Sequence, residues 1–133
     1  ITVAMWRKFM LICAWSGLAS VARAPVGILL KQGETRQLLV DAMQEIYTLA
    51  LSRNINMPAD SVHKTIEMLE SFPANSTTSM QRDITQGRPS ELDAHHGAVV
   101  RLAQDSGIDT PVNRFILYSL RSQELRARGA LSF

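Results

Sequence analysis

The sequence predicts an all-α fold of about six helices, and three observations lead to this class. Apolar residues recur at helical spacing in every long segment. Sustained two-residue alternation flanked by hairpin dipeptides does not occur, so strands are not expected. Residues that start or stop helices separate the apolar segments. With 133 residues, the chain is long enough to bury a core of its own as one helical domain, 1–133.

The first half of the chain is predicted to contain two long helices joined by a short connection. The first should cover residues 3–22 and end before Pro25, because proline cannot continue a helix. Residues 25–30 should form a short turn or helix that closes at Gly33. The second long helix should cover residues 34–53. Its apolar face consists of Leu38, Leu39, Ala42, Ile46, Leu49 and Ala50.

A third and a fourth helix are predicted from their start and stop signals. Asp60 is expected to cap a third helix that reaches about position 72, because Pro73 prevents its continuation. Thr77 or Thr78 should cap a short fourth helix, which stops at Gly87.

A fifth and a sixth helix are predicted in the last third of the chain. Ser90, with Asp93 three residues later, resembles a capping box that opens a helix to about position 104, with Gly107 just past its end. Thr110 followed by Pro111 at the first helical position should open a helix that runs to about position 126.

Composition excludes several classes of function. The formal net charge is only +2 and the basic residues are dispersed, so we do not expect binding to DNA or RNA. The longest uncharged run, residues 9–22, is shorter than the roughly 20 apolar residues that a membrane-spanning helix needs. Cys13 is the single cysteine, which excludes an internal disulfide and favours a reducing, cytoplasmic setting. Glycine-rich phosphate loops and the H-E-x-x-H zinc motif do not occur.

A few polar side chains stand where packing alone does not require them. Lys8 and Ser16 lie two turns apart on one face of an otherwise apolar helix. Ser79 and Asp83 are one turn apart on the short fourth helix. Glu91 falls in the first turn of the fifth helix, where the helix dipole favours a carboxylate. On spacing alone, ordinary roles explain each of them: a lysine reaching solvent, a cap and a helix-start acid.

No metal site is expected. His95 and His96 are adjacent, so their side chains diverge by about 100 degrees on a helix. Glu91 with His95, or Asp93 with His96, could supply two ligands, but no third ligand has suitable spacing. Cys13 is expected to be a core residue.

Several motifs resemble one known family in order and spacing. The run TSMQRDITQGRPSELDAHHGAVVRLAQDSGIDTPVNRFILYSL, residues 78–120, carries a Ser-Met pair, a Gly-Arg, a Ser-Glu-Leu-Asp and a Thr-Pro-x-Asn. The start, MWRKFMLICAWSGLASVARAPVG, contains a Trp-x-Lys helix and an Arg-x-Pro-x-Gly. Together these segments resemble the C-terminal domain of the ketopantoate reductase (2-dehydropantoate 2-reductase) family, and nearly the whole chain aligns.

The resemblance implies an all-α fold similar to the C-terminal domain of 6-phosphogluconate dehydrogenase. It also implies an NADPH-dependent reduction of a 2-keto acid, such as ketopantoate to pantoate in pantothenate biosynthesis. Lys8 matches the family's catalytic general acid, and Ser79 matches the serine that binds the substrate. Glu91 matches the glutamate that contacts the cofactor ribose. Ser16 and Ser76 stand at substrate-side positions where the family has asparagine.

Several positions that carry asparagine in the family differ in this chain, and these differences bear on which substrate it accepts. Ile12 and Ser16 replace two asparagines on the first helix, and His96 replaces a third. Ser16 keeps a hydroxyl group, but Ile12 has no hydrogen-bonding group to offer a substrate. We therefore expect the substrate to be a different or less hydroxylated 2-keto acid.

The family places a Rossmann domain before the helical domain, and this chain has no glycine-rich turn. NADPH should therefore bind mostly through that other domain, and the isolated chain is expected to be inactive. The expected partners are a 2-keto acid and the Rossmann domain. A second copy of the chain, in a homodimer, is a further expected partner. An alternative is a free-standing helical module for dimerisation or ligand binding, in which Lys8, Ser79 and Glu91 would be dispensable. A dehydrogenase that joins a keto acid to an amine shares the two-domain plan, but not the motifs.

Overall fold

The computed structural model describes residues 2–133, and this part of the chain folds into helices joined by loops, with no strand. Its elements are α1 (Thr2–Ala22), α2 (Val26–Lys31), α3 (Gly33–Ser52), α4 (Ser61–Glu70), α5 (Ser79–Thr85), the π-helix η1 (Asp93–Gly97), α6 (Ala98–Ser106) and α7 (Pro111–Ala127). The all-α prediction is confirmed. The element count exceeds six because the connection after Pro25 forms α2 and because the expected fifth helix divides into η1 and α6.

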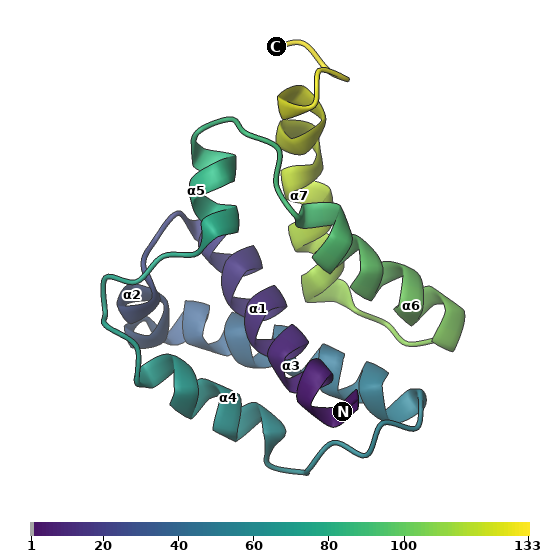
Figure 1. Cartoon of the computed structure of the whole chain (residues 1–133). Helices are drawn as coiled ribbons and strands as arrows, with labels where there is room; N and C mark the ends of the chain where they lie inside the picture. The colour runs from purple at the N-terminus through teal and green to yellow at the C-terminus, as the bar shows by residue number, and fades with distance from the viewer. Residues whose placement is uncertain (1) are drawn as a thin grey trace.

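Helix α1 runs through the middle of the fold, with α3, α4, α5, α7 and η1 packed around it (Figure 1). Since it has neighbours on several sides, its second half is buried all round rather than along one stripe. Alanine, glycine and serine dominate this buried stretch and let the neighbouring helices approach closely. The buried residues of α1 are Met10, Cys13, Ala14, Ser16, Gly17, Leu18, Ala19 and Ser20.

The main core lies where α1, α3 and α4 meet. Helix α3 makes the largest single contribution to it, through residues at helical spacing: Leu39, Ala42, Met43, Ile46, Leu49 and Ala50 are all inaccessible to solvent. This agrees with the predicted apolar face except at Leu38, which is 39% exposed. None of the described helices is both long enough and apolar enough to cross a membrane.

Two of the predicted local helix starts have different outcomes. The side chain of Thr78 accepts a hydrogen bond from the backbone N of Gln81 at 3.1 Å, and Gln81 reaches back to the backbone N of Thr78 at 3.4 Å. These two bonds form a capping box and confirm Thr78 as the cap of α5. Asp60 occupies the N-cap position of α4, as predicted, but its side chain makes no capping hydrogen bond.

The start of α7 is capped from another helix. Thr110 stands at the N-cap position and Pro111 at the first helical position, as predicted, but the Thr110 side chain makes no capping bond. Glu45 of α3, which the sequence places off the apolar face, accepts hydrogen bonds from the backbone N of Val112 at 2.8 Å and of Asn113 at 3.0 Å. The Asn113 side chain also donates to Glu45 at 2.8 Å. A tertiary carboxylate therefore replaces the local cap, and it joins α3 to α7.

The capping box predicted at Ser90 and Asp93 is not formed either. The Ser90 hydroxyl donates to Oε1 of Glu124 on α7 at 2.5 Å, and Asp93 pairs with Arg101 at 3.1 Å. The Ser90 oxygen also accepts a hydrogen bond from the backbone N of Leu92 at 3.2 Å, and the helix that follows begins as the π-helix η1. A π-turn shifts the phase of a helix by accommodating one extra residue per turn, and it is often found at functional sites.

Candidate functional site

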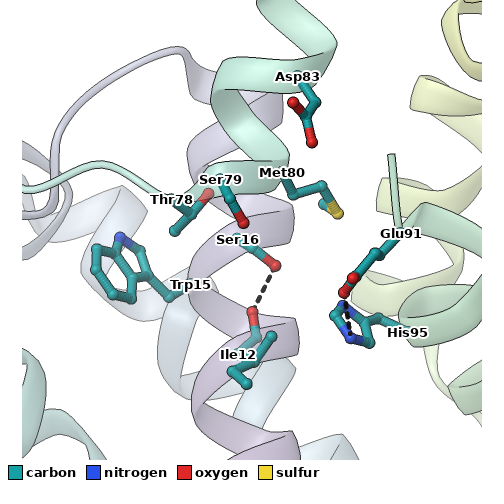
Figure 2. A pocket seen from close by; sticks show the side chains of 9 residues that line it. All are labelled: Ile12, Trp15, Ser16, Thr78, Ser79, Met80, Asp83, Glu91 and His95. Carbon is teal, nitrogen blue, oxygen red and sulfur yellow. Dashed lines mark hydrogen bonds and ion pairs between the residues drawn. The ribbon is translucent and has the colours of Figure 1, made fainter. Parts of the chain in front are cut away.

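A cavity of about 330 Å³ opens between α1, α5 and the segment that leads into η1 (Figure 2). Three elements separated in the chain supply its walls. The lining residues are Ile12, Trp15 and Ser16 from α1, Thr78, Ser79, Met80 and Asp83 from α5 and its cap, and Glu91 and His95 from the third wall. The cavity therefore brings together four polar residues singled out in the sequence: Ser16, Ser79, Asp83 and Glu91.

The hydroxyl groups of the cavity differ in what they can still bind. Ser16 is 3% exposed, and its hydroxyl donates to the carbonyl of Ile12 at 2.5 Å. It therefore keeps only acceptor capacity for a ligand. Thr78 uses its oxygen as an acceptor for α5, which leaves its proton free to donate. Ser79 is exposed, and no hydrogen bond of its side chain occurs within residues 2–133.

Each of the two carboxylates that line the cavity lies close to a basic side chain. Asp83 pairs with Arg88 at 2.9 Å. Glu91 has an Oε2 oxygen 3.2 Å from Nε2 of His95, one turn further on, while 73% of its side chain stays exposed. Figure 2 shows the Glu91 carboxylate and the His95 ring together on the side opposite α5. The Asp83–Arg88 pair reduces the negative charge that a ligand in the cavity would meet.

Lys8 lines a second, neighbouring groove instead of this cavity. The groove has a volume of about 360 Å³ and is lined by Met5, Trp6, Lys8, Phe9, Ile12 and Leu102. Ile12 lines both spaces, so the groove and the cavity share one wall on α1. The Lys8 side chain is exposed, and none of the ion pairs found within residues 2–133 involves it.

Ser76 is the candidate that the geometry does not bring to the others. It is absent from the lining of both the cavity and the groove. Its backbone carbonyl accepts a hydrogen bond from the N of Val26 at 3.0 Å. This contact ties the segment before α5 to the start of α2, which is a structural role.

His96, next to the cavity residue His95, attaches η1 to α1. It is completely buried, and its Nε2 donates to the carbonyl of Cys13 on α1 at 2.7 Å. A Cβ at position 17 would collide with this ring nitrogen, so Gly17 makes the close approach possible. Burial lowers the pKa of His96 to about 4, although the bond to Cys13 acts in the opposite direction. The neutral ring thus joins η1 to α1.

The prediction for the single cysteine agrees with the structure. Cys13 is fully buried, which confirms it as a core residue, and burial raises the pKa of its thiol above the usual range. Among residues 2–133, no group of three histidine, cysteine, aspartate or glutamate side chains is placed to hold a metal ion.

Sequence reasoning missed two apolar residues that line the cavity, Trp15 and Met80. A signal for both exists in their spacing. Trp15 lies three residues after Ile12, about one helical turn, and directly precedes Ser16. Met80 directly follows Ser79. Both are residue types that usually fill cores, so neither stands out before the walls are assembled.

Comparisons with known proteins identify the family. A family profile described as ketopantoate reductase PanE/ApbA C terminal matches residues 1–124. The chain belongs to this family. A 2-dehydropantoate 2-reductase from Pyrobaculum aerophilum is 25% identical to it over 119 residues, which are 90% of this chain and 42% of the relative. The chain thus spans about two fifths of the length of such relatives.

Solved structures show the same helical fold. The dimeric ketopantoate reductase from Staphylococcus aureus matches with a TM-score of 0.89 at 24% identity, over 96% of this chain and 44% of that protein. D-mandelate dehydrogenase, in a ternary structure with NADH and anilino(oxo)acetate, matches with a TM-score of 0.83 at 22% identity, over 96% of this chain and 42% of that one. These likenesses agree with the fold predicted for a ketopantoate reductase C-terminal domain.

Proposed function

We propose that this chain is the substrate-side domain of a 2-keto acid reductase of the ketopantoate reductase type. One observation carries the proposal: the two segments with family motifs, α1 and residues 78–95, face each other across one cavity. Family membership supports the reaction class. The chain would act together with a Rossmann domain, and its coverage of 42% of a full-length relative fits such a division. A second copy of the chain is a further proposed partner.

Lys8 is the proposed acid of the reaction. A reduced nicotinamide cofactor, NADPH in this proposal, supplies a hydride to the carbonyl carbon when bound. The ammonium group of Lys8 donates a proton to the carbonyl oxygen, so that the C=O bond becomes the C–OH bond of a 2-hydroxy acid. Because Lys8 is exposed, it can regain its proton from solvent. Its flexible side chain starts one turn before Ile12, the residue that both spaces share.

The charges around the site favour an anionic substrate. Asp83 is paired with Arg88, and Glu91 is paired with His95. Lys8 thus adds a positive charge that no described residue neutralises, and it can attract the carboxylate of a keto acid. The free hydroxyls of Thr78 and Ser79 are the proposed donors to that carboxylate.

Glu91 suits a contact with the cofactor ribose. One of its carboxylate oxygens faces His95, and the largely exposed side chain leaves the other oxygen free to accept a bond from a ribose hydroxyl. The residues present therefore fit the edge of a nicotinamide nucleotide. Contacts to the pyrophosphate are assigned to the Rossmann domain, whose glycine-rich turn performs this task.

The test is a rate measurement on the enzyme expressed from its complete reading frame. With ketopantoate and NADPH, Lys8→Ala should lower kcat by about 100-fold or more, because a general acid contributes about that much. The neighbouring exposed cation provides the control, and Arg7→Ala should leave kcat unchanged. The isolated 133-residue chain should not oxidise NADPH. Unchanged turnover in Lys8→Ala would refute the proposal and favour the free-standing binding module.

A further inference from the structure

The groove beside Lys8 is apolar in a way that the neighbouring cavity is not. Apart from Lys8, every lining side chain is a methionine, an aromatic or an aliphatic residue: Met5, Trp6, Phe9, Ile12 and Leu102. The cavity on the other side of Ile12 carries three hydroxyls, two carboxylates and an imidazole. A hydroxyl group placed in the groove would therefore find at most two side-chain donors there, the Lys8 ammonium and the indole N–H of Trp6, and no side-chain acceptor except a methionine sulfur.

A substrate that reaches Lys8 would lie across Ile12, the residue that lines both the groove and the cavity. A keto acid whose carbonyl oxygen reaches Lys8 has its carboxylate on one side of the carbonyl carbon and its side chain on the other. The carboxylate needs donors, and the free hydroxyls of Thr78 and Ser79 lie on the cavity side. The side chain is then directed into the groove, where contact with Met5, Trp6 and Phe9 removes apolar surface from water.

We propose that this groove receives the substrate side chain, and that the preferred substrates are 2-keto acids with an apolar, hydroxyl-free side chain. The inference rests on the proposed function and specifies its substrate class. Met5 is 64% exposed at the groove's rim, so the space is open to side chains of different length. Burying an unpartnered hydroxyl is unfavourable, and an apolar pocket rejects a hydroxylated analogue by up to about 100-fold.

A matched pair of substrates tests the preference in the complete enzyme. Trimethylpyruvate and ketopantoate differ by one hydroxyl group, and phenylpyruvate adds an aromatic ring. We expect kcat/KM for trimethylpyruvate to exceed that for ketopantoate by about 10-fold or more. The variant Met5→Gln, which brings an amide into the groove, should reduce this ratio severalfold. Ile28→Gln, at an apolar residue 51% exposed on α2 and outside the groove, should not change it.

The two tryptophans of the chain report on the two spaces separately. Trp6 lines the groove and Trp15 lines the cavity. In two-dimensional ¹H–¹⁵N spectra of the 133-residue chain, phenylpyruvate at millimolar concentration should shift the indole N–H signal of Trp6. Ketopantoate should shift it less, and Lys8→Ala should abolish the effect. The absence of any Trp6 shift with phenylpyruvate overturns the inference.

The outcomes separate this inference from the proposed function. If the enzyme reduces ketopantoate best and Lys8→Ala inactivates it, the reductase assignment stands and the groove assignment is wrong. A shift of Trp15 alone also contradicts the groove assignment, because the side chain then lies in the cavity. If no 2-keto acid is reduced by the complete enzyme, the proposed function itself fails.

Discussion

Two regions of the molecule are held together in different ways. Helices α1, α3 and α4 share one apolar core, to which α3 contributes a full face of buried side chains. The region of η1 and α7 has a smaller apolar cluster and is also fastened by polar contacts. These contacts are His96 to the Cys13 carbonyl, Glu45 to the start of α7, and Glu124 to Ser90.

The difference teaches how the site is assembled. Apolar contacts are non-directional, so the first region gains stability without a strict orientation of its side chains. Hydrogen bonds are directional, and they determine how η1, which contains His95, and the preceding Glu91 face α1 across the cavity. The first region should therefore respond to lost volume, whereas the second should respond to pH and to the loss of a single partner.

The largest effect is expected in the apolar region. Leu39→Ala removes a completely buried side chain and should lower the free energy of unfolding by about 3 to 4 kcal/mol through lost burial and a new cavity. Urea unfolding followed by circular dichroism measures the change. The adjacent Leu38 is 39% exposed, so Leu38→Ala should cost less than about 1 kcal/mol. Equal losses for the two leucines would show that this helix face is not the core.

Acid should weaken the second region through His96. Its pKa is about 4 in the folded chain against 6.5 for an ordinary histidine. The unfolded chain then binds more protons between these values, so this group's contribution is full above about pH 6.5 and is lost as pH falls towards 4. The expected loss reaches about 3 kcal/mol.

The control for this pH effect is a residue that does not titrate. The unfolding free energies of the wild type and of His96→Gln are compared between pH 7 and pH 4. The advantage of the wild type should shrink as the pH falls. An advantage that is constant with pH would mean that His96 is not a buried neutral group.

A smaller effect is expected from the carboxylate that caps α7. Glu45→Ala leaves two backbone N–H groups and the Asn113 amide without this acceptor and should cost about 2 kcal/mol. Asp41, one turn earlier, accepts only an exposed bond from Gln37 at 2.8 Å. Asp41→Ala should therefore change the unfolding free energy by less than about 0.5 kcal/mol. A cost for Asp41 as large as that for Glu45 would contradict the capping role.

The smallest effect is expected at a surface ion pair. Arg36 and Glu70 join α3 to α4 at 3.2 Å, but their side chains are 40% and 47% exposed. Solvent screens such pairs, so Arg36→Ala should cost less than about 0.5 kcal/mol. A loss above about 1 kcal/mol, measured by the same urea unfolding, would show that polar contacts also fasten the first region.

The sequence predicted features that depend on nearby residues better than features that depend on contacts between helices. The bounds of α1 and α3 were predicted to within one or two residues, and Thr78 was recognised as a cap, because each signal lies within a few residues of its effect. The start of α7 at Pro111 was also predicted, but the contacts of Glu124 and Glu45 at the starts of η1 and α7 were missed, because both carboxylates come from other helices. The proposed site residues Lys8, Ser79 and Glu91 were named through family resemblance, since each has an ordinary explanation on spacing alone.

Helical periodicity and stop signals in the chain are sufficient for the all-α class, since both depend on neighbours along the backbone. Folding adds what depends on distant partners. His96 meets the Cys13 carbonyl 83 positions away in the chain, and Glu45 meets Asn113 across 68 positions. The same packing separates Lys8 in an apolar groove from Ser79 and Glu91 in a polar cavity, with Ile12 between them. Such pairings arise from the combined packing of several helices, so no local pattern specifies them.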